Sequence, residues 1–346
     1  MDEQTRSRRA AARRPRLNTV RMSDVAALAG VSAMTVSRAI HDPKSVTQET
    51  INKIQEAIAA SGYVPNRIAS SLASSHTNIV GLIVPSLRNS LFAETIQGVA
   101  DILGPAFNLL IADSGYTLKG EEAAVLAFLS QRVCGIVMHN TKHTQRTRRM
   151  VENAGIPAVE TGNLLARPID MSVGFSNHDA ASAMTEYLIA RNYRRIGFVS
   201  LALRDNDRAS ERRRGYLTAL RKHRIRINES RILESPPGLK AGGEALVHLV
   251  EGPGVDAVFL AGDVLATGAL LEANRRRWSV PGKVAIAGSD DNELQEQVTP
   301  ALTTLRFPRY EIGRRAAGML LDRLKGRSKG AAVLNLGFEI IERGSV

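Results

Sequence analysis

The chain has 346 residues, of which 44% are hydrophobic, and a formal net charge of +12 at pH 7. This length can bury more than one hydrophobic core, so we expect several compact units. A single cysteine, Cys134, excludes an internal disulfide, and neither a secretion signal nor an apolar run of about 18 residues is found. We therefore expect a cytoplasmic protein without a membrane partner, whose positive charge favours a polyanion.

Residues 1–19 form a basic arm in which arginines stand among Ala, Ser and Pro. We expect the arm to be disordered when it is free. Two interpretations remain open, since such an arm can follow a phosphate backbone or only keep the protein soluble.

Residues 23–40 predict two short helices joined by a tight turn. Apolar positions recur with helical spacing in Val25–Ala29 and again in Val36–Ile40. Gly30 between them permits the turn, and Ser32 can cap the second helix. This is the plan of a DNA-binding helix-turn-helix, with a generic amphipathic hairpin as the alternative. The second helix carries side chains suited to base edges and phosphates, namely Thr35, Ser37 and Arg38.

A third helix is predicted after Pro43. Val46–Thr50 reads as a capped start, and apolar residues recur at helical spacing until Gly62 ends the segment. We therefore expect a three-helix domain over residues 20–65, followed by a hinge over residues 66–76 and a first buried strand at Ile79–Val84.

Three motifs in this region occur in order: D-V-A-x-x-A-G-V-S-x-x-T-V-S-R, then G-Y-x-P-N, then A-x-x-L-A. Through them the chain resembles the lactose-repressor family of transcription factors. The resemblance implies that the hinge becomes helical when two copies meet in the minor groove, each inserting Leu72 at the central base step. Ordinary packing of Leu72 in a linker is the alternative. A paired hinge implies a homodimer on a near-palindromic operator DNA.

The same resemblance places the second helix in the major groove. Ala33 and Met34 then occupy the positions that vary operator preference, and they can read bases only by apolar contact. His41 either adds a contact or is merely exposed. The expected DNA-binding residues are Ser23, Ser32, Ala33, Met34, Thr35, Ser37, Arg38 and His41 in the head, with Asn66, Ala69 and Leu72 in the hinge.

From Ile79 onward, buried strands alternate with amphipathic helices, which predicts an α/β fold with parallel sheets covered by helices on both faces. Two such doubly wound subdomains in tandem are similar to the periplasmic-binding-protein type that the family joins to its head. We expect the core to span residues 77–346. Its first subdomain is predicted over residues 77–175 plus 304–333, and its second over 176–303 plus 334–346.

Ligands of tandem α/β subdomains bind at strand ends in the crevice between them. The residues that match the family's effector-binding positions are Ser86, Leu91, Phe92, His139, Glu160, Arg208, Arg212, Asp263 and Asp290. Phe92 could equally belong to the core, and Asp290 could form a helix cap or a salt bridge. Arginines at 204, 208 and 212 suggest an acidic ligand, although a solvated basic face is the alternative.

Further segments, R-T-R-R-M-V-E-N-A-G-I-P-A-V-E among them, resemble the gluconate-operon repressor branch and imply gluconate or a related sugar acid. The run from Gly288 to Asp291 departs from that branch, so a ketogluconate or a neutral sugar stays open. No catalytic constellation, metal-ligand spacing or phosphate-binding loop is found, and no cofactor is expected. We expect a repressor whose operator affinity an effector controls. The alternatives are a neutral or phosphorylated sugar as corepressor, a protein partner, a sugar-processing enzyme and a transport-binding protein.

Overall fold

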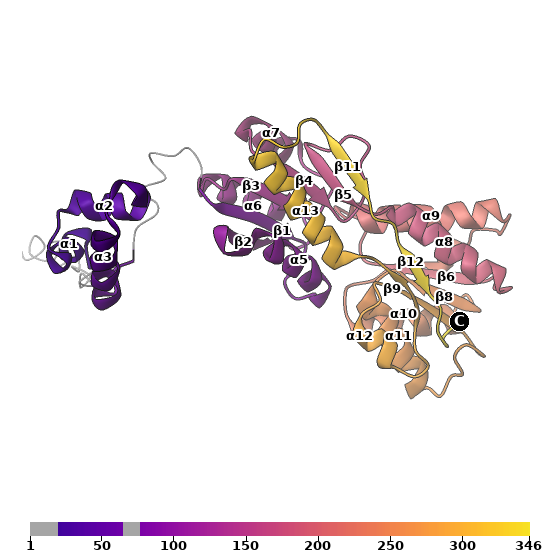
Figure 1. Ribbon diagram of the computed structural model, residues 1–346. Helices are drawn as coiled ribbons and strands as arrows, with labels where there is room; N and C mark the ends of the chain where they lie inside the picture. Colours follow the sequence, from indigo (N-terminus) through magenta and orange to yellow (C-terminus); the bar gives the residue numbers. More distant parts are fainter. Residues whose placement is uncertain (1–19, 65–76) are drawn as a thin grey trace, which may run out of the picture. The chain divides into compact units, whose positions relative to one another are not determined.

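The computed structural model describes residues 20–64 and 77–346 (Figure 1). The chain divides between residues 76 and 77 into two compact units. The expected arm and the expected hinge, with Asn66, Ala69 and Leu72, lie outside the described residues.

The first unit contains the three predicted helices, α1 (Met22–Ala29), α2 (Ala33–His41) and α3 (Gln48–Ser61). Their shared core is built on Val25, Val36 and Ile54, which are almost fully buried. Gly30 makes the turn with a left-handed backbone, φ 67°, which explains the glycine there. The side chain of Ser32 caps α2 by accepting a hydrogen bond from the backbone N–H of Thr35 at 3.1 Å. The helix-turn-helix prediction is thus confirmed.

The second unit contains two six-stranded sheets, and each was expected as one subdomain. The first sheet has the order β11-β5-β4-β3-β1-β2 and is parallel throughout. Its strands are β1 (Ile79–Val84), β2 (Asn108–Asp113), β3 (Gly135–Met138), β4 (Ala158–Thr161), β5 (Met171–Gly174) and β11 (Ala332–Asn335). The second sheet has the order β12-β10-β9-β8-β6-β7 and is parallel except for β12 against β10. Its strands are β6 (Ile196–Ser200), β7 (Ile232–Glu234), β8 (Ala257–Leu260), β9 (Ala285–Ser289), β10 (Thr303–Arg306) and β12 (Glu339–Ile341).

Helices connect the strands in both subdomains (Figure 1). Those of the first are α5 (Ala93–Leu103), α6 (Leu118–Ser130), α7 (Gln145–Ala154) and α13 (Arg309–Leu324). Those of the second are α8 (Asn177–Ala190), α9 (Asp207–Lys222), α10 (Leu239–Glu251), α11 (Asp263–Arg275) and α12 (Glu293–Gln297). This is the expected doubly wound architecture of the periplasmic-binding-protein type.

Helices α5 and α13 approach each other closely through two glycines. A Cβ on Gly98 would lie 2.2 Å from the carbonyl oxygen of Tyr310, and one on Gly313 would lie 2.2 Å from that of Thr95. No side chain fits at either position. Although α5 and α13 are far apart in sequence, their backbones therefore pack directly against each other over the first sheet.

The chain passes between the subdomains three times, after β5, after β10 and after β11. The sequence placed the second passage at residue 304 and the third at residue 333. Instead, Thr303 in β10 is in register with Ala287 in β9, so β10 belongs to the second sheet and the passage follows Arg306. Strand β11 pairs with β5 up to Asn335, so the third passage follows that residue.

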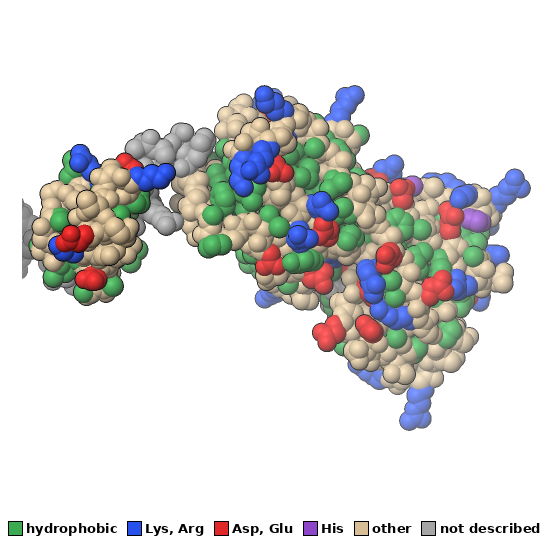
Figure 2. Space-filling model, in the orientation of Figure 1, with side chains coloured by type: hydrophobic (Ala, Val, Ile, Leu, Met, Phe, Trp, Pro, Cys, Tyr) green, Lys and Arg blue, Asp and Glu red, His purple; other side chains and the backbone are tan. Residues whose placement is uncertain are grey.

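Charged side chains of both signs are interspersed over the face of the core that Figure 2 shows. In the arginine-rich segment that begins near residue 204, several cations have acidic partners, as in Arg213–Glu229 at 3.2 Å and Arg214–Glu211 at 2.5 Å. Arg213 and Arg214 thus belong to a solvated face. In the two described ranges, no helix combines the length and the apolar character that crossing a membrane requires.

Candidate functional site

Helix α2 presents the expected DNA-contacting side chains at the surface of the head. Ala33, Arg38 and His41 are exposed, and the Met34 side chain is 64% exposed, which is unusual for a large apolar residue. Thr35 and Ser37 are half-buried, Ser23 is exposed on α1, and the Ser32 hydroxyl is engaged in the cap. These residues form a short strip of apolar and polar side chains on the surface of the head.

A cavity of about 50 Å³ lies between the two sheets, where strands end at their carboxyl edges. This volume is well below the roughly 300–1,000 Å³ of typical small-molecule sites, so the cleft is closed around its lining. The cavity contains six of the nine expected effector residues, Leu91, Phe92, His139, Arg208, Arg212 and Asp290. Ten further residues line it: Asn89, Tyr116, Gly162, Phe175, Leu201, Asn206, Ala209, Ala261, Gly262 and Arg309.

An ionic cluster forms one wall of the cavity. The carboxylate of Asp290 accepts a hydrogen bond from Nη2 of Arg309, and Nη2 of Arg212 lies 3.8 Å from the same oxygen. All three side chains are at most 10% exposed. Burial raises the pKa of Asp290, but the charges of Arg309 and Arg212 outweigh burial, so this pKa lies below its ordinary value. Asp290 is therefore an anion shared by two arginines.

A pair of stacked aromatic rings packs against the two arginines of this cluster. Phe307 stacks on Phe175 with ring centroids 3.9 Å apart, and the guanidinium carbons of Arg212 and Arg309 lie 5.6 Å and 5.4 Å from the Phe307 centroid. Cation–π attraction favours this placement, most of all in a dry site. Phe175 lies at the first passage of the chain and Phe307 at the second, so the stack joins two of the segments that connect the subdomains.

Arg212 is held in a fixed orientation within its own subdomain. Its Nε donates to Oδ1 of Asn177 at 2.9 Å, and its Nη1 donates to the carbonyl oxygen of Ala261 at 3.0 Å. Asn177 in turn donates through Nδ2 to the carbonyl oxygen of Gly162 at 2.7 Å. One edge of the guanidinium is thus fixed by the protein, and Nη2 faces Asp290 and the cavity.

His139 is neutral in this wall. Burial, with the nearby charges of Arg208, Arg309 and Arg212, holds the pKa of His139 well below its ordinary value. Its Nδ1 lies 3.0 Å from the hydroxyl of Thr161, which donates to the carbonyl oxygen of Met138. Nδ1 therefore carries the proton, and Nε2 is left as an acceptor for a ligand hydroxyl.

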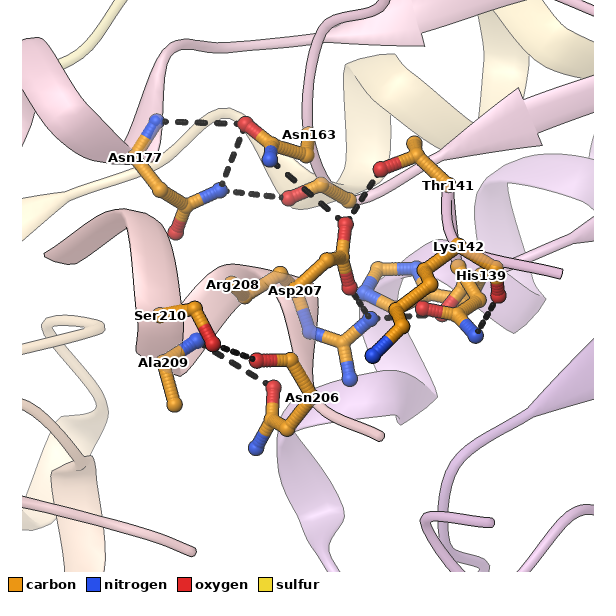
Figure 3. A network of polar contacts seen from close by, with 12 residues as sticks. His139, Thr141, Lys142, Asn163, Asn177, Asn206, Asp207, Arg208, Ala209 and Ser210 are labelled. Carbon is orange, nitrogen blue, oxygen red and sulfur yellow. Dashed lines mark hydrogen bonds and ion pairs between the residues drawn. The ribbon is translucent and has the colours of Figure 1, made fainter. Parts of the chain in front are cut away.

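Arg208 connects the two subdomains at the edge of the cavity (Figure 3). It lies in the first turn of α9, and its Nη1 donates to the carbonyl oxygen of His139 at 2.8 Å. Arg212 follows one turn later on the same helix, as the four-residue spacing predicted. Arg204, by contrast, precedes α9 and is exposed.

Two of the expected effector residues, Ser86 and Glu160, are not among the described side chains that line the cavity. Ser86 accepts a hydrogen bond from the backbone N–H of Arg88, and Glu160 contacts His143 and the backbone N–H of Ile169. The side chain of Asp263 lies outside the description. Conversely, Arg309 lines the cavity but was not predicted from the sequence, where it appears only as a basic residue after Phe307-Pro308.

Residues 21–66 match the family described as "Bacterial regulatory proteins, lacI family", and residues 185–346 match the "Periplasmic binding protein-like domain". The HTH-type transcriptional regulator GntR of Pseudomonas aeruginosa is 37% identical over 335 residues, 96% of this chain and 96% of that protein. IdnR of Escherichia coli is 33% identical over 329 residues, 94% of this chain and 98% of that one. The chain belongs to the LacI family of transcriptional regulators.

Solved structures agree with this assignment. A LacI-family regulator from Silicibacter pomeroyi has a TM-score of 0.89 at 30% identity, covering 94% of this chain and 99% of that one. The Lac repressor dimer bound to operator and the anti-inducer ONPF has a TM-score of 0.79 at 25% identity, covering 94% and 98%. The protein is thus a cytoplasmic DNA-binding regulator with a ligand-binding core, and not an enzyme. No cluster of metal-ligating side chains occurs among the residues that the structure describes.

Proposed function

We propose that the protein is a repressor that binds a near-palindromic operator as a homodimer, and that a sugar acid such as gluconate controls its operator affinity from the cleft. The observation that carries the choice of an acid is the charge of the cavity wall. Among the lining side chains that the structure describes, Arg208, Arg212 and Arg309 stand with one carboxylate, that of Asp290. A monoanionic ligand reduces this excess of positive charge, whereas a neutral sugar leaves it unchanged.

The chemistry of the lining also fits a polyhydroxy acid. Guanidinium groups form charge-assisted hydrogen bonds with carboxylates, which supports Arg309 and Nη2 of Arg212 as partners of a ligand carboxylate. Asp290 and Nε2 of His139 are acceptors for hydroxyl groups on the rest of the ligand. Because the cavity is only about 50 Å³, the subdomains must open to admit the ligand and close again around it.

Operator recognition is proposed through α2 of each protomer. Met34 and Ala33 offer apolar contact to a base such as thymine, and Arg38 offers a cation to a phosphate or a guanine edge. Leu72 in the hinge is proposed as the minor-groove wedge. The variant Leu72→Ala should then weaken specific operator binding while leaving nonspecific binding nearly unchanged, because a wedge acts only in the bent complex. An equal loss of both modes would contradict the wedge.

A second copy of the chain is the proposed occupant of two apolar areas on the core. Leu110 and Ile111 on the edge strand β2 are 38% and 36% exposed. Leu126 is exposed on α6, which contacts β2. Leu239 and Leu271 are exposed beside a groove between α10 and α11. Apolar side chains that are exposed next to one another, rather than singly, are typical of protein contacts.

Calorimetric titration of the full-length protein, with and without an operator duplex, tests the effector assignment. D-gluconate and 2-keto-D-gluconate should bind, and D-glucose should not. Operator should weaken gluconate binding by the same factor by which gluconate weakens operator binding, since linkage is reciprocal. Tighter gluconate binding on DNA would make it a corepressor. Binding of only neutral or phosphorylated sugars, or of none, would refute the sugar acid and favour another sugar or a protein partner.

A further inference from the structure

A buried cluster of titratable side chains lies beside the cleft but outside it. The imidazole of His143 lies between two carboxylates, with Nδ1 2.6 Å from Oε1 of Glu121 and Nε2 2.9 Å from Oε1 of Glu160. The three side chains are no more than 3% exposed. Glu121 comes from the first turn of α6 and Glu160 from β4, so the imidazole is held from two separate elements.

The segment anchored by this histidine crosses to the other subdomain. His143 belongs to the loop of residues 139–144 between β3 and α7, which we call the β3–α7 loop. Two residues before the histidine, the hydroxyl of Thr141 donates to Oδ2 of Asp207, the first residue of α9 (Figure 3). Nδ2 of Asn163 lies 3.5 Å from the same oxygen. The loop thus makes a direct polar contact across the mouth of the cleft.

We propose that His143, clamped between Glu121 and Glu160, positions the β3–α7 loop as a latch that holds the effector cleft closed through Thr141 and Asp207. The assignment of the cleft to an effector rests on the proposed function. The latch itself rests on the contacts just described. His143 is not among the described residues that line the cavity, so it acts as a positioning residue.

Only the charged form of His143 satisfies both carboxylates. An imidazolium donates from both ring nitrogens, whereas a neutral ring would turn a lone pair toward one of two buried anions. Burial lowers the pKa of His143, but the hydrogen bonds and charges of Glu121 and Glu160 outweigh it and raise this pKa to about 9. The anchor is therefore intact at neutral pH and is lost as pH rises through about 9.

Lys142 of the loop is exposed, and two other acidic groups near the loop, Glu122 and Asp207, have partners of their own. Glu122 on α6 accepts hydrogen bonds from Thr144 at 2.6 Å and from Nη1 of Arg146 at 3.1 Å. Asp207 lies on the far side of the cleft, where Nη1 of Arg208 is 3.4 Å from its Oδ1. Glu121 and Glu160 are thus the acids that set the charge of His143. Thr141 is the residue through which the loop contacts the other subdomain.

Hydrogen exchange of the full-length protein tests the latch without any ligand, read at the first turn of α9. That turn is in the other subdomain, so a purely local role of His143 would not change it. Thr141→Val and His143→Gln should each speed exchange there by about 10-fold, since the first removes the hydrogen bond from Thr141 to the Asp207 carboxylate and the second releases the loop that positions this bond. The double variant should show no further increase in the exchange rate, because both changes break the same latch. Lys142→Ala, an exposed neighbour, should change nothing.

Wild-type protein supplies a second measurement that requires no substitution. Protection of the first turn of α9, relative to α10 in the same sample, should fall as pH passes about 9, and Thr141→Val should abolish that fall. Additive increases of the exchange rate in the double variant, or unchanged exchange at α9 in Thr141→Val, would overturn the latch. If His143→Gln does not fold, the pH series and Thr141→Val still decide.

Titration with D-gluconate separates the latch from the proposed function. Thr141→Val should weaken gluconate binding by about 10-fold although Thr141 does not line the cavity. If gluconate fails to bind the wild type, the sugar-acid assignment fails while the exchange results still stand. If gluconate binds both proteins equally well, the latch is refuted and the assignment remains.

Discussion

Arg212→Lys is the sharpest test of the acidic ligand, because it keeps the charge and removes only the fork. The guanidinium spans three partners: Nε bonds Asn177, Nη1 bonds the Ala261 carbonyl, and Nη2 lies 3.8 Å from Asp290. A single ammonium nitrogen cannot keep the contacts with Asn177 and the Ala261 carbonyl and also place a donor where Nη2 faces the cavity. The lysine should therefore lose at least one charge-assisted hydrogen bond to the ligand carboxylate, about 1.5–3 kcal/mol, which weakens binding by about 10- to 150-fold.

Isothermal titration with D-gluconate measures this loss, and gluconate-induced release of a labelled operator provides an independent measure. Arg213→Lys is the matched control, because Arg213 is the next residue of α9 but pairs with Glu229 at the surface. The control should bind gluconate like the wild type. Wild-type affinity in Arg212→Lys, or an equal loss in the control, would show that Arg212 does not bind the carboxylate.

Three further outcomes follow from the geometry. Gly313→Ala should destabilise the core by about 2–3 kcal/mol in urea unfolding, because the new Cβ would lie 2.2 Å from the backbone of α5. Gly318→Ala on the same helix has open space around it and should stabilise the core by about 0.5–1 kcal/mol, so similar effects of the two variants would contradict the close packing. Since folding raises the pKa of His143 from 6.5 to about 9, its contribution, on the order of 3 kcal/mol, should be complete below pH 6.5 and disappear as pH passes 9, and a flat urea midpoint over that window would exclude the charged clamp. Gly162→Ala should reduce gluconate affinity in calorimetry without affecting operator binding, because φ is 92° and the new Cβ would lie 2.8 Å from Nε2 of His139; unchanged affinity would remove His139 from the site.

The features that sequence predicted are those fixed by local chemistry. The turn at Gly30, the cap by Ser32 and the apolar spacing around Val36 all act within a few residues, so the head could be derived from them. The alternation of strands and helices likewise predicted both sheets. Arg212 was indicated by its spacing of four residues from Arg208 together with the family resemblance. Such spacing places two side chains on one face of a helix and can be seen in the sequence.

The differences between sequence and structure came from contacts between distant segments. Glu160 and Thr161 are adjacent in β4, so their side chains point to opposite faces: Glu160 contacts His143, whereas Thr161 contacts His139, which lines the cavity. Strand periodicity alone does not say which face meets the cleft. Arg309 was missed for a related reason: it reaches Asp290 only because the chain passes back between the subdomains at that point.

The triple passage of the chain also has a consequence for its synthesis on the ribosome. Helix α5 ends at Leu103, but α13, the helix whose backbone it packs against, begins at Arg309, about 200 residues later. At roughly 5–20 residues per second, about 10–40 s separate the emergence of the two partners. Strand β11, the last strand of the first sheet, emerges later still. The first subdomain therefore cannot complete its fold until the second has been made, and during that interval its unfinished apolar face is a natural target for chaperones.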